Sequence, residues 1–158
     1  MWTPCRKGRL FMSAQLRRKA ELFYIALGDV WSAEQLQYGN PNNAVWHCTQ
    51  AVEKTMKGCL FCLGKEYGFG HDLKELSDAI NDLFELPKEI NIYVLNLNSY
   101  TVRLRYRNMK TDPTAEDAKV VISRTKQIMD AFAKIPDISG YMEEAKEVHT
   151  KTLKSIED

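Results

Sequence analysis

The sequence predicts an all-α protein, an up-and-down bundle of four to five antiparallel helices with a short extra helix at the C-terminus. Long segments carry apolar side chains three or four positions apart, which is the spacing of one helix face. Short breaks rich in Gly, Pro or Asn separate these segments, as expected between antiparallel neighbours. Two of the breaks are followed by helix-capping patterns, Asp72 with Glu75 and Thr114 with Asp117.

The composition limits the classes of function. A chain of 158 residues fits one domain and can bury a core without metals or disulfides. Its net charge of +1 gives no overall attraction to nucleic acid or membranes, so a site for either would be a local patch. No apolar run approaches the roughly 18 residues of a membrane helix. Four cysteines are too few for a disulfide scaffold, and we expect reduced thiols in a cytoplasmic protein.

The chain divides into three parts. Residues 1–12 are basic and lack helical periodicity, so we expect a disordered N-terminal arm. Residues 13–135 hold the bundle. Residues 136–158 are charged and thinly apolar, which predicts a helix or tail that packs only at an edge or stays mobile.

The first two helices have clear apolar stripes and a clear boundary. We expect the first over 13–37, ended by Gly39-Asn40-Pro41, and the second from Pro41 to Leu63, where Pro suits the first helical position. The stripe of the first helix is Leu16, Ala20, Phe23, Leu27, Val30 and Trp31. The stripe of the second helix is Val45, Cys48, Thr49, Val52, Met56, Cys59, Leu60 and Leu63.

Three further helices follow. The third opens at Asp72, points Leu73, Leu76, Ile80 and Leu83 inward, and ends at Leu86-Pro87. The fourth covers about 89–108, and although residues 90–94 favour a strand by propensity, no partner strand is apparent. One side of this helix carries Tyr93, Leu97, Tyr100 and Leu104. The opposite side carries Ser99, Arg103, Tyr106 and Arg107. The fifth covers 114–133, with Ala118, Val121, Ile122, Thr125, Ile128, Met129 and Phe132 in the core.

The polar face of the second helix draws attention because it gathers charge at helical spacing. It carries Gln50, Glu53, Lys54 and Lys57, and Glu53 precedes Lys57 by four positions, the favourable order for an ion pair on a helix.

The histidines and cysteines give weak signals. Cys59-x-x-Cys62 lies late in a helix without a second cysteine pair, so we interpret these residues as buried free thiols. His47 fits a core or groove position, and His149 fits the surface. His71 precedes a helix cap, where it either packs locally or faces a site for an anion.

The basic and aromatic cluster at Arg103, Arg105, Tyr106 and Arg107 allows two interpretations. It is either a solvated helix end or a contact for phosphate or RNA, with forked hydrogen bonds from Arg and stacking by Tyr. No Ser-His-Asp order, phosphate-binding glycine loop or zinc-protease motif is present.

Three pieces of the sequence together resemble the HEPN family, the higher-eukaryote and prokaryote nucleotide-binding domain. Gln50-Ala51-Val52-Glu53-Lys54, followed by Lys57 and Leu60, resembles its second-helix signature. Gly70-His71-Asp72-Leu73 resembles its His-Asp-Leu element, and Tyr100 with Arg105-Tyr106 resembles the element that ends its fourth helix. Asp29 suits its acidic position in the first helix. The resemblance covers about residues 13–133.

The resemblance implies a helical bundle, often a dimer, with a groove for nucleotide or RNA. The ribonuclease branch needs an Arg followed after four to six residues by His, and the sequence lacks this pair. The resemblance is therefore to a branch without it, whose members resemble nucleotide binders or companions of a small nucleotidyltransferase in toxin–antitoxin systems. No cofactor or metal is expected. The implied ligand-binding residues are Gln50, Lys54, Lys57, His71, Arg103, Arg105 and Tyr106.

The residues leave three functions open. We prefer a non-catalytic HEPN-type module that binds nucleotide or RNA. The second is an atypical metal-independent ribonuclease toxin that uses Arg105 with Tyr106 or His71. The third is a structural homodimeric interaction bundle, in which Glu53 and Lys54 belong to a dimer or core network.

Overall fold

A computed structural model describes residues 2–4, 10–12, 14–65, 70–104 and 112–157. Within these ranges two short strands, β1 (Trp2–Pro4) and β2 (Leu10–Met12), precede six helices. The helices are α1 (Ala14–Leu36), α2 (Pro41–Cys62), α3 (Leu73–Asn81), α4 (Lys88–Arg103), α5 (Ala115–Ala133) and α6 (Pro136–Glu157).

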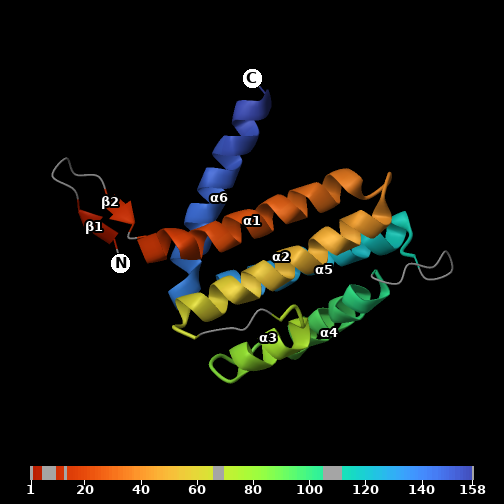
Figure 1. Ribbon diagram of the computed structural model, residues 1–158, viewed down its shortest axis with the longest axis horizontal. Helices are drawn as coiled ribbons and strands as arrows, with labels where there is room; N and C mark the ends of the chain where they lie inside the picture. The colour runs from red at the N-terminus through yellow and green to blue at the C-terminus, as the bar shows by residue number, and fades with distance from the viewer. Residues whose placement is uncertain (1, 5–9, 13, 66–69, 105–111, 158) are drawn as a thin grey trace.

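The long helices are stacked around α2, which confirms the predicted helical bundle. α1 packs along one side of α2 and α5 along another, while α3 and α4 close a third side (Figure 1). α6 crosses α1 and its C-terminal half extends beyond the bundle (Figure 1). α2 is consequently the most enclosed helix, with thirteen buried residues over its length.

Local capping interactions explain where the helices begin. The Asn40 side chain accepts a hydrogen bond from the backbone N–H of Asn43, and Pro41 occupies the first turn of α2. Asp72 caps α3 by accepting from two backbone N–H groups of its first turn. Thr114 and Asp117 bond reciprocally at the start of α5, as predicted. Each cap satisfies backbone donors that have no partner inside the helix.

The core consists of one large cluster of buried side chains and a smaller one, and α1 and α2 approach each other closely within the large one. Phe23, Met56 and Phe132 are fully buried in the large cluster. Gly58 of α2 faces the Phe23 ring, and a Cβ at this position would lie 2.8 Å from a ring carbon. The missing side chain therefore lets the two helices approach each other.

Three expectations differ from the structure. Trp2–Pro4 and Leu10–Met12 pair as antiparallel strands within the arm 1–12 that we expected to be disordered; these stretches contain aromatic and β-branched residues, which favour strands. α6 is 22 residues long rather than short, because Ile138, Met142 and Ala145 bury one face of its first half. Trp31 and Leu83 are exposed rather than inward, and Leu83 follows the last residue of α3, where helical periodicity no longer applies.

None of the helices in the described ranges is both long enough and apolar enough to cross a membrane.

We predict opposite effects for two glycine-to-alanine changes. Gly58→Ala should lower the free energy of unfolding by roughly 1–3 kcal/mol, since the new Cβ would press against the Phe23 ring, which is itself fully buried. Gly28→Ala in α1 is the matched control, because its Cβ meets nothing within 4 Å. It should be stabilising by about 0.5–1 kcal/mol through helix propensity. Urea unfolding measures both; equal effects would mean that the Phe23 contact is not tight.

Candidate functional site

The first cluster on the polar side of α2 is centred on Asp29 of α1. One carboxylate oxygen of Asp29 accepts from His47 Nδ1 at 2.8 Å, and the other accepts from Lys54 Nζ at 2.7 Å. The Asp29 side chain is only 12% exposed. This carboxylate therefore binds two successive turns of α2 to α1, with a partly desolvated ion pair at its centre.

The second cluster is centred on Glu53 of α2. Its Oε1 accepts from Lys57 Nζ at 2.7 Å and from His71 Nδ1 at 2.8 Å. The Glu53 residue is 6% exposed, whereas the His71 side chain is largely exposed. The bond to His71 fixes the segment just before α3 against α2, so one buried carboxylate positions both a helix face and a loop.

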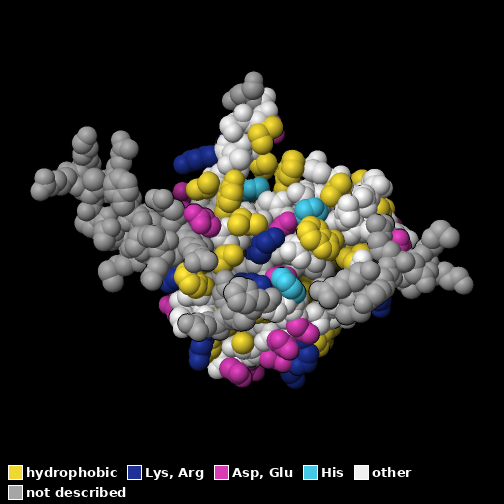
Figure 2. All heavy atoms as spheres, in the orientation of Figure 1, with side chains coloured by type: hydrophobic (Ala, Val, Ile, Leu, Met, Phe, Trp, Pro, Cys, Tyr) yellow, Lys and Arg dark blue, Asp and Glu magenta, His cyan; other side chains and the backbone are white. Residues whose placement is uncertain are grey.

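A groove opens beside the Glu53 cluster, between α2, the start of α3 and the end of α4. Its volume is about 250 Å³. In the space-filling view, histidine, lysine and acidic side chains gather along α2 between hydrophobic patches (Figure 2). The groove is lined by Trp46, Thr49, Gln50, Glu53, His71, Thr101 and Leu104.

The two histidines are oriented in the same way. In each, Nδ1 donates to a carboxylate, so Nε2 points away from the ion pair and can bond to a ligand.

The two lysines of α2 have a different role from the one expected. Lys54 and Lys57 are held by Asp29 and Glu53, so their charges are already balanced within the protein. Hydrogen bonding, rather than net positive charge, is what this groove offers a ligand.

The structure brings together only part of the predicted ligand-binding set. Gln50 and His71 line the groove, and Lys54 and Lys57 lie beside it in ion pairs. Arg103 is exposed and lines a separate cavity between α4 and α5. Arg105 and Tyr106 lie outside the described residues.

Sequence reasoning did not identify Trp46 and Thr101 as groove residues. Trp46 is partly exposed although it belongs to an apolar stretch. Thr101 precedes Leu104, which also lines the groove, by three positions, the spacing of one helix face, and this signal could have indicated it.

The cysteines confirm the expectation of buried free thiols. Cys48 and Cys59 are buried and Cys62 is partly buried, and all three are unpaired. Burial raises the pKa of Cys48 to about 12 and that of Cys62 to about 11, and it raises the pKa of Cys59 well above its ordinary value. Such thiols are protonated at neutral pH and poor nucleophiles. Within the described residues, no group of three or more His, Cys, Asp or Glu side chains is arranged to hold a metal ion.

Comparisons with known proteins point to one family. The model of the HEPN domain family matches residues 15–135, nearly the span of the predicted bundle. The crystal structure of an archaeal HEPN homologue superposes with a TM-score of 0.59 at 21% sequence identity. That match covers 76% of this chain and 96% of the archaeal chain, and it supports the fold. No curated protein matches the sequence at a significant level.

Removing the charge of Glu53 should destabilise the protein. Glu53→Gln removes the buried carboxylate to which both the Lys57 ammonium and the His71 ring donate, and we expect a loss of roughly 1–3 kcal/mol in chemical unfolding. Asp78→Asn is the control, because it breaks an ion pair of the same spacing with Lys74 whose two side chains are more than half exposed. It should change stability by less than about 0.5 kcal/mol. Similar losses in the two variants would contradict a structural role for Glu53.

The cysteine pKa directions predict slow alkylation. A thiol whose pKa rises from 9.0 to about 11 has on the order of 100-fold less thiolate at pH 8, and only the thiolate reacts. Iodoacetamide should therefore label the folded Cys5→Ser variant, which retains the three described thiols, far more slowly than the same variant in urea. Equal rates, followed by mass spectrometry, would show that these thiols are accessible and ionise normally.

Proposed function

This chain belongs to the HEPN domain family, and we propose that within it the chain is a non-catalytic module that binds a nucleotide or RNA in the groove between α2, α3 and α4. The observation that carries the proposal is the His71 imidazole. The buried Glu53 carboxylate holds its Nδ1 at 2.8 Å, which leaves Nε2 for a ligand in the groove.

The lining of the groove suits the parts of a nucleotide. Gln50 carries an amide that both donates and accepts, which matches base edges and sugar hydroxyls. Trp46 offers an exposed aromatic surface at the margin for stacking. His71 donates from Nδ1 to Glu53, so its Nε2 is available to accept a hydrogen bond from a sugar hydroxyl or a base amino group. Lys54 and Lys57 act as positioning residues, because they hold the carboxylates of Asp29 and Glu53 in place. Arg105 and Tyr106 directly follow Leu104, a residue of the groove wall, in the sequence.

The finer parts of the proposal concern partners. The family resemblance supports a homodimer in the cytoplasm and a small nucleotidyltransferase as companion in a toxin–antitoxin system. Pull-down with the product of a neighbouring nucleotidyltransferase gene tests the companion, and light scattering tests the dimer.

A second candidate, a metal-independent ribonuclease, is favoured by one observation. The pairing of His71 with a buried carboxylate is the arrangement that tunes and orients a general acid or base. The sequence nevertheless lacks the Arg and His pair of the ribonuclease branch. Incubating labelled RNA with the purified chain distinguishes the two: intact RNA supports a binding module, and cleavage that His71→Ala abolishes supports the enzyme.

We predict that single changes in the groove reduce affinity. ATP and a short single-stranded RNA, titrated separately into the whole chain by fluorescence or calorimetry, should bind about tenfold more weakly to Gln50→Ala and His71→Ala, because each loses a hydrogen bond to the ligand. Arg105→Ala should weaken binding similarly if the segment after Leu104 contacts phosphate.

The matched control is His149→Ala on α6, which removes a histidine outside the groove and should leave affinity unchanged. Circular dichroism establishes that each variant is folded. Unchanged affinity in both Gln50→Ala and His71→Ala, with folding intact, would show that the groove is not the binding site.

A further inference from the structure

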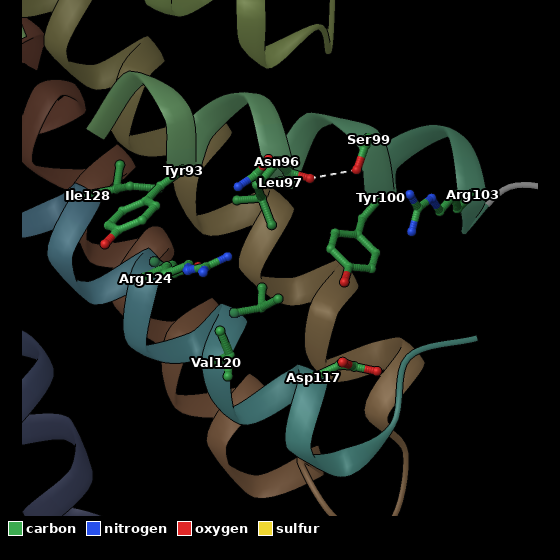
Figure 3. A pocket seen from close by; sticks show the side chains of 12 residues that line it. Tyr93, Asn96, Leu97, Ser99, Tyr100, Arg103, Asp117, Val120, Arg124 and Ile128 are labelled. Atoms are coloured by element: carbon green, nitrogen blue, oxygen red, sulfur yellow. Dashed lines mark hydrogen bonds between the residues drawn. The ribbon is translucent and has the colours of Figure 1, made fainter. Parts of the chain in front are cut away.

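A second cavity lies between α4 and α5, and α4 separates it from the α2 groove. Its volume is about 280 Å³. Figure 3 shows a trough whose upper wall is α4 and whose lower wall is α5, with Arg124 toward one end and Arg103 toward the other. Among the described residues, none lines both the trough and the groove.

Arg124 is held in place by an aromatic ring. Its guanidinium carbon lies 5.1 Å from the centre of the Tyr93 ring. The Tyr93 hydroxyl donates to Glu89 at 2.6 Å. This hydrogen bond is the main reason why the pKa of Tyr93 is raised. Tyr93 is therefore a neutral phenol at physiological pH and supplies a ring face rather than a negative charge.

Arg103 and Arg124 differ from the lysines of α2 because they form no ion pair with a carboxylate of the described residues. Throughout the described ranges, neither guanidinium is within ion-pairing distance of a carboxylate. Arg103 stacks on Tyr100 at 5.4 Å, and Arg124 is only partly exposed. A half-buried guanidinium without an anion has lost water contacts that an incoming anion can replace.

One carboxylate does line the trough, but it is already used. Asp117 accepts from both the backbone N–H and the hydroxyl of Thr114 at the start of α5. These bonds lower its pKa, so it remains ionised and committed to the helix cap. The lining therefore carries the positive charges of Arg103 and Arg124 and the negative charge of Asp117. This excess of positive charge favours an anionic ligand.

The floor of the trough is apolar. Leu97, Val121 and Ile128 are buried beneath it, and Val120 is 46% exposed at its margin. A ligand with an apolar or aromatic body would cover this surface, and each apolar group removed from water adds to affinity. The lining as a whole is mixed, because polar side chains surround this apolar floor, and such a combination can hold the apolar body of a ligand while polar groups fix its orientation.

We propose that the α4–α5 trough is a second binding site, which takes a small organic anion with an aromatic or branched apolar body and a phosphate or carboxylate group that pairs with Arg124. Tyr93 positions the guanidinium, and Arg103 contributes a second positive charge at the other end. The site is independent of the groove that binds nucleotide or RNA in the proposed function.

Calorimetric titration of the whole chain with phenyl phosphate, benzoate, AMP and inorganic phosphate tests this site. Phenyl phosphate or benzoate should bind, and inorganic phosphate should bind less well because it has no apolar body. Arg124→Met keeps the aliphatic packing and should weaken binding about tenfold by removing the charged partner. Lys119→Met, which removes an exposed charge from the same helix outside the trough, should leave binding unchanged.

Val120→Glu provides a second variant in case Arg124→Met does not fold. The position is exposed, so the fold should tolerate it, and the new carboxylate at the margin should repel the anion. Tighter binding of phenyl phosphate assigns phosphate esters and tighter binding of benzoate assigns carboxylates; each supports the site. Binding of AMP is assigned to the trough only where Arg124→Met weakens it, since the α2 groove is proposed to bind nucleotides as well.

The proposal is overturned if neither phenyl phosphate nor benzoate binds, or if their affinities are unchanged in Arg124→Met and Val120→Glu. A negative result for the trough can be told apart from a negative result for nucleotide or RNA binding in the α2 groove. Arg124→Met should leave the RNA affinity intact, and His71→Ala should leave the phenyl phosphate affinity intact. Loss of RNA affinity in Arg124→Met would overturn the independence of the two sites.

Discussion

The arrangement of the polar side of this bundle depends on one buried carboxylate. Glu53 lies on the most enclosed helix, where an ionised group without partners would cost several kcal/mol. Lys57 from the same helix and His71 from the segment before α3 both donate to its Oε1, and these two bonds compensate for the lost water. The position of the His71 ring, and with it one wall of the groove, follows from this requirement, while Leu73, Leu76 and Ile80 hold α3 itself against the core. Asp29 repeats the arrangement between α1 and α2 with His47 and Lys54.

The parts of the fold that sequence reasoning predicted well are those that local interactions determine. α2 was expected from Pro41 to Leu63 and covers Pro41–Cys62, because a capping Asn, a Pro in the first turn and an uninterrupted apolar stripe act within a few residues of each other. The length of α6 was underestimated for the opposite reason. Its apolar residues are few, and how much they stabilise the helix depends mainly on contacts with α1, which lies at the other end of the sequence.

The same distinction explains what was missed at the candidate site. The helical spacing correctly placed Gln50, Glu53, Lys54 and Lys57 on the polar side of one helix. It could not predict that Lys54 pairs with Asp29, because that bond joins residues 25 positions apart on different helices. The family resemblance grouped residues of α2 with residues near the end of α4, and a resemblance in sequence does not specify which side of α4 each residue occupies.

α4 separates two surfaces of different electrostatic character. Toward α2, Thr101 of α4 and Leu104 just after it line a groove where the carboxylates of Asp29 and Glu53 balance the adjacent lysines. Toward α5 it presents Arg103 to a trough where the guanidinium charges exceed the acidic charge. A balanced groove discriminates among ligands by hydrogen-bond geometry and shape, since it offers little net charge to attract an anion. An excess of positive charge beside an apolar floor instead selects for charge and apolar area. A protein with a net charge of only +1 can therefore recognise an anion through a local patch, because the charges near the binding site matter more than the total.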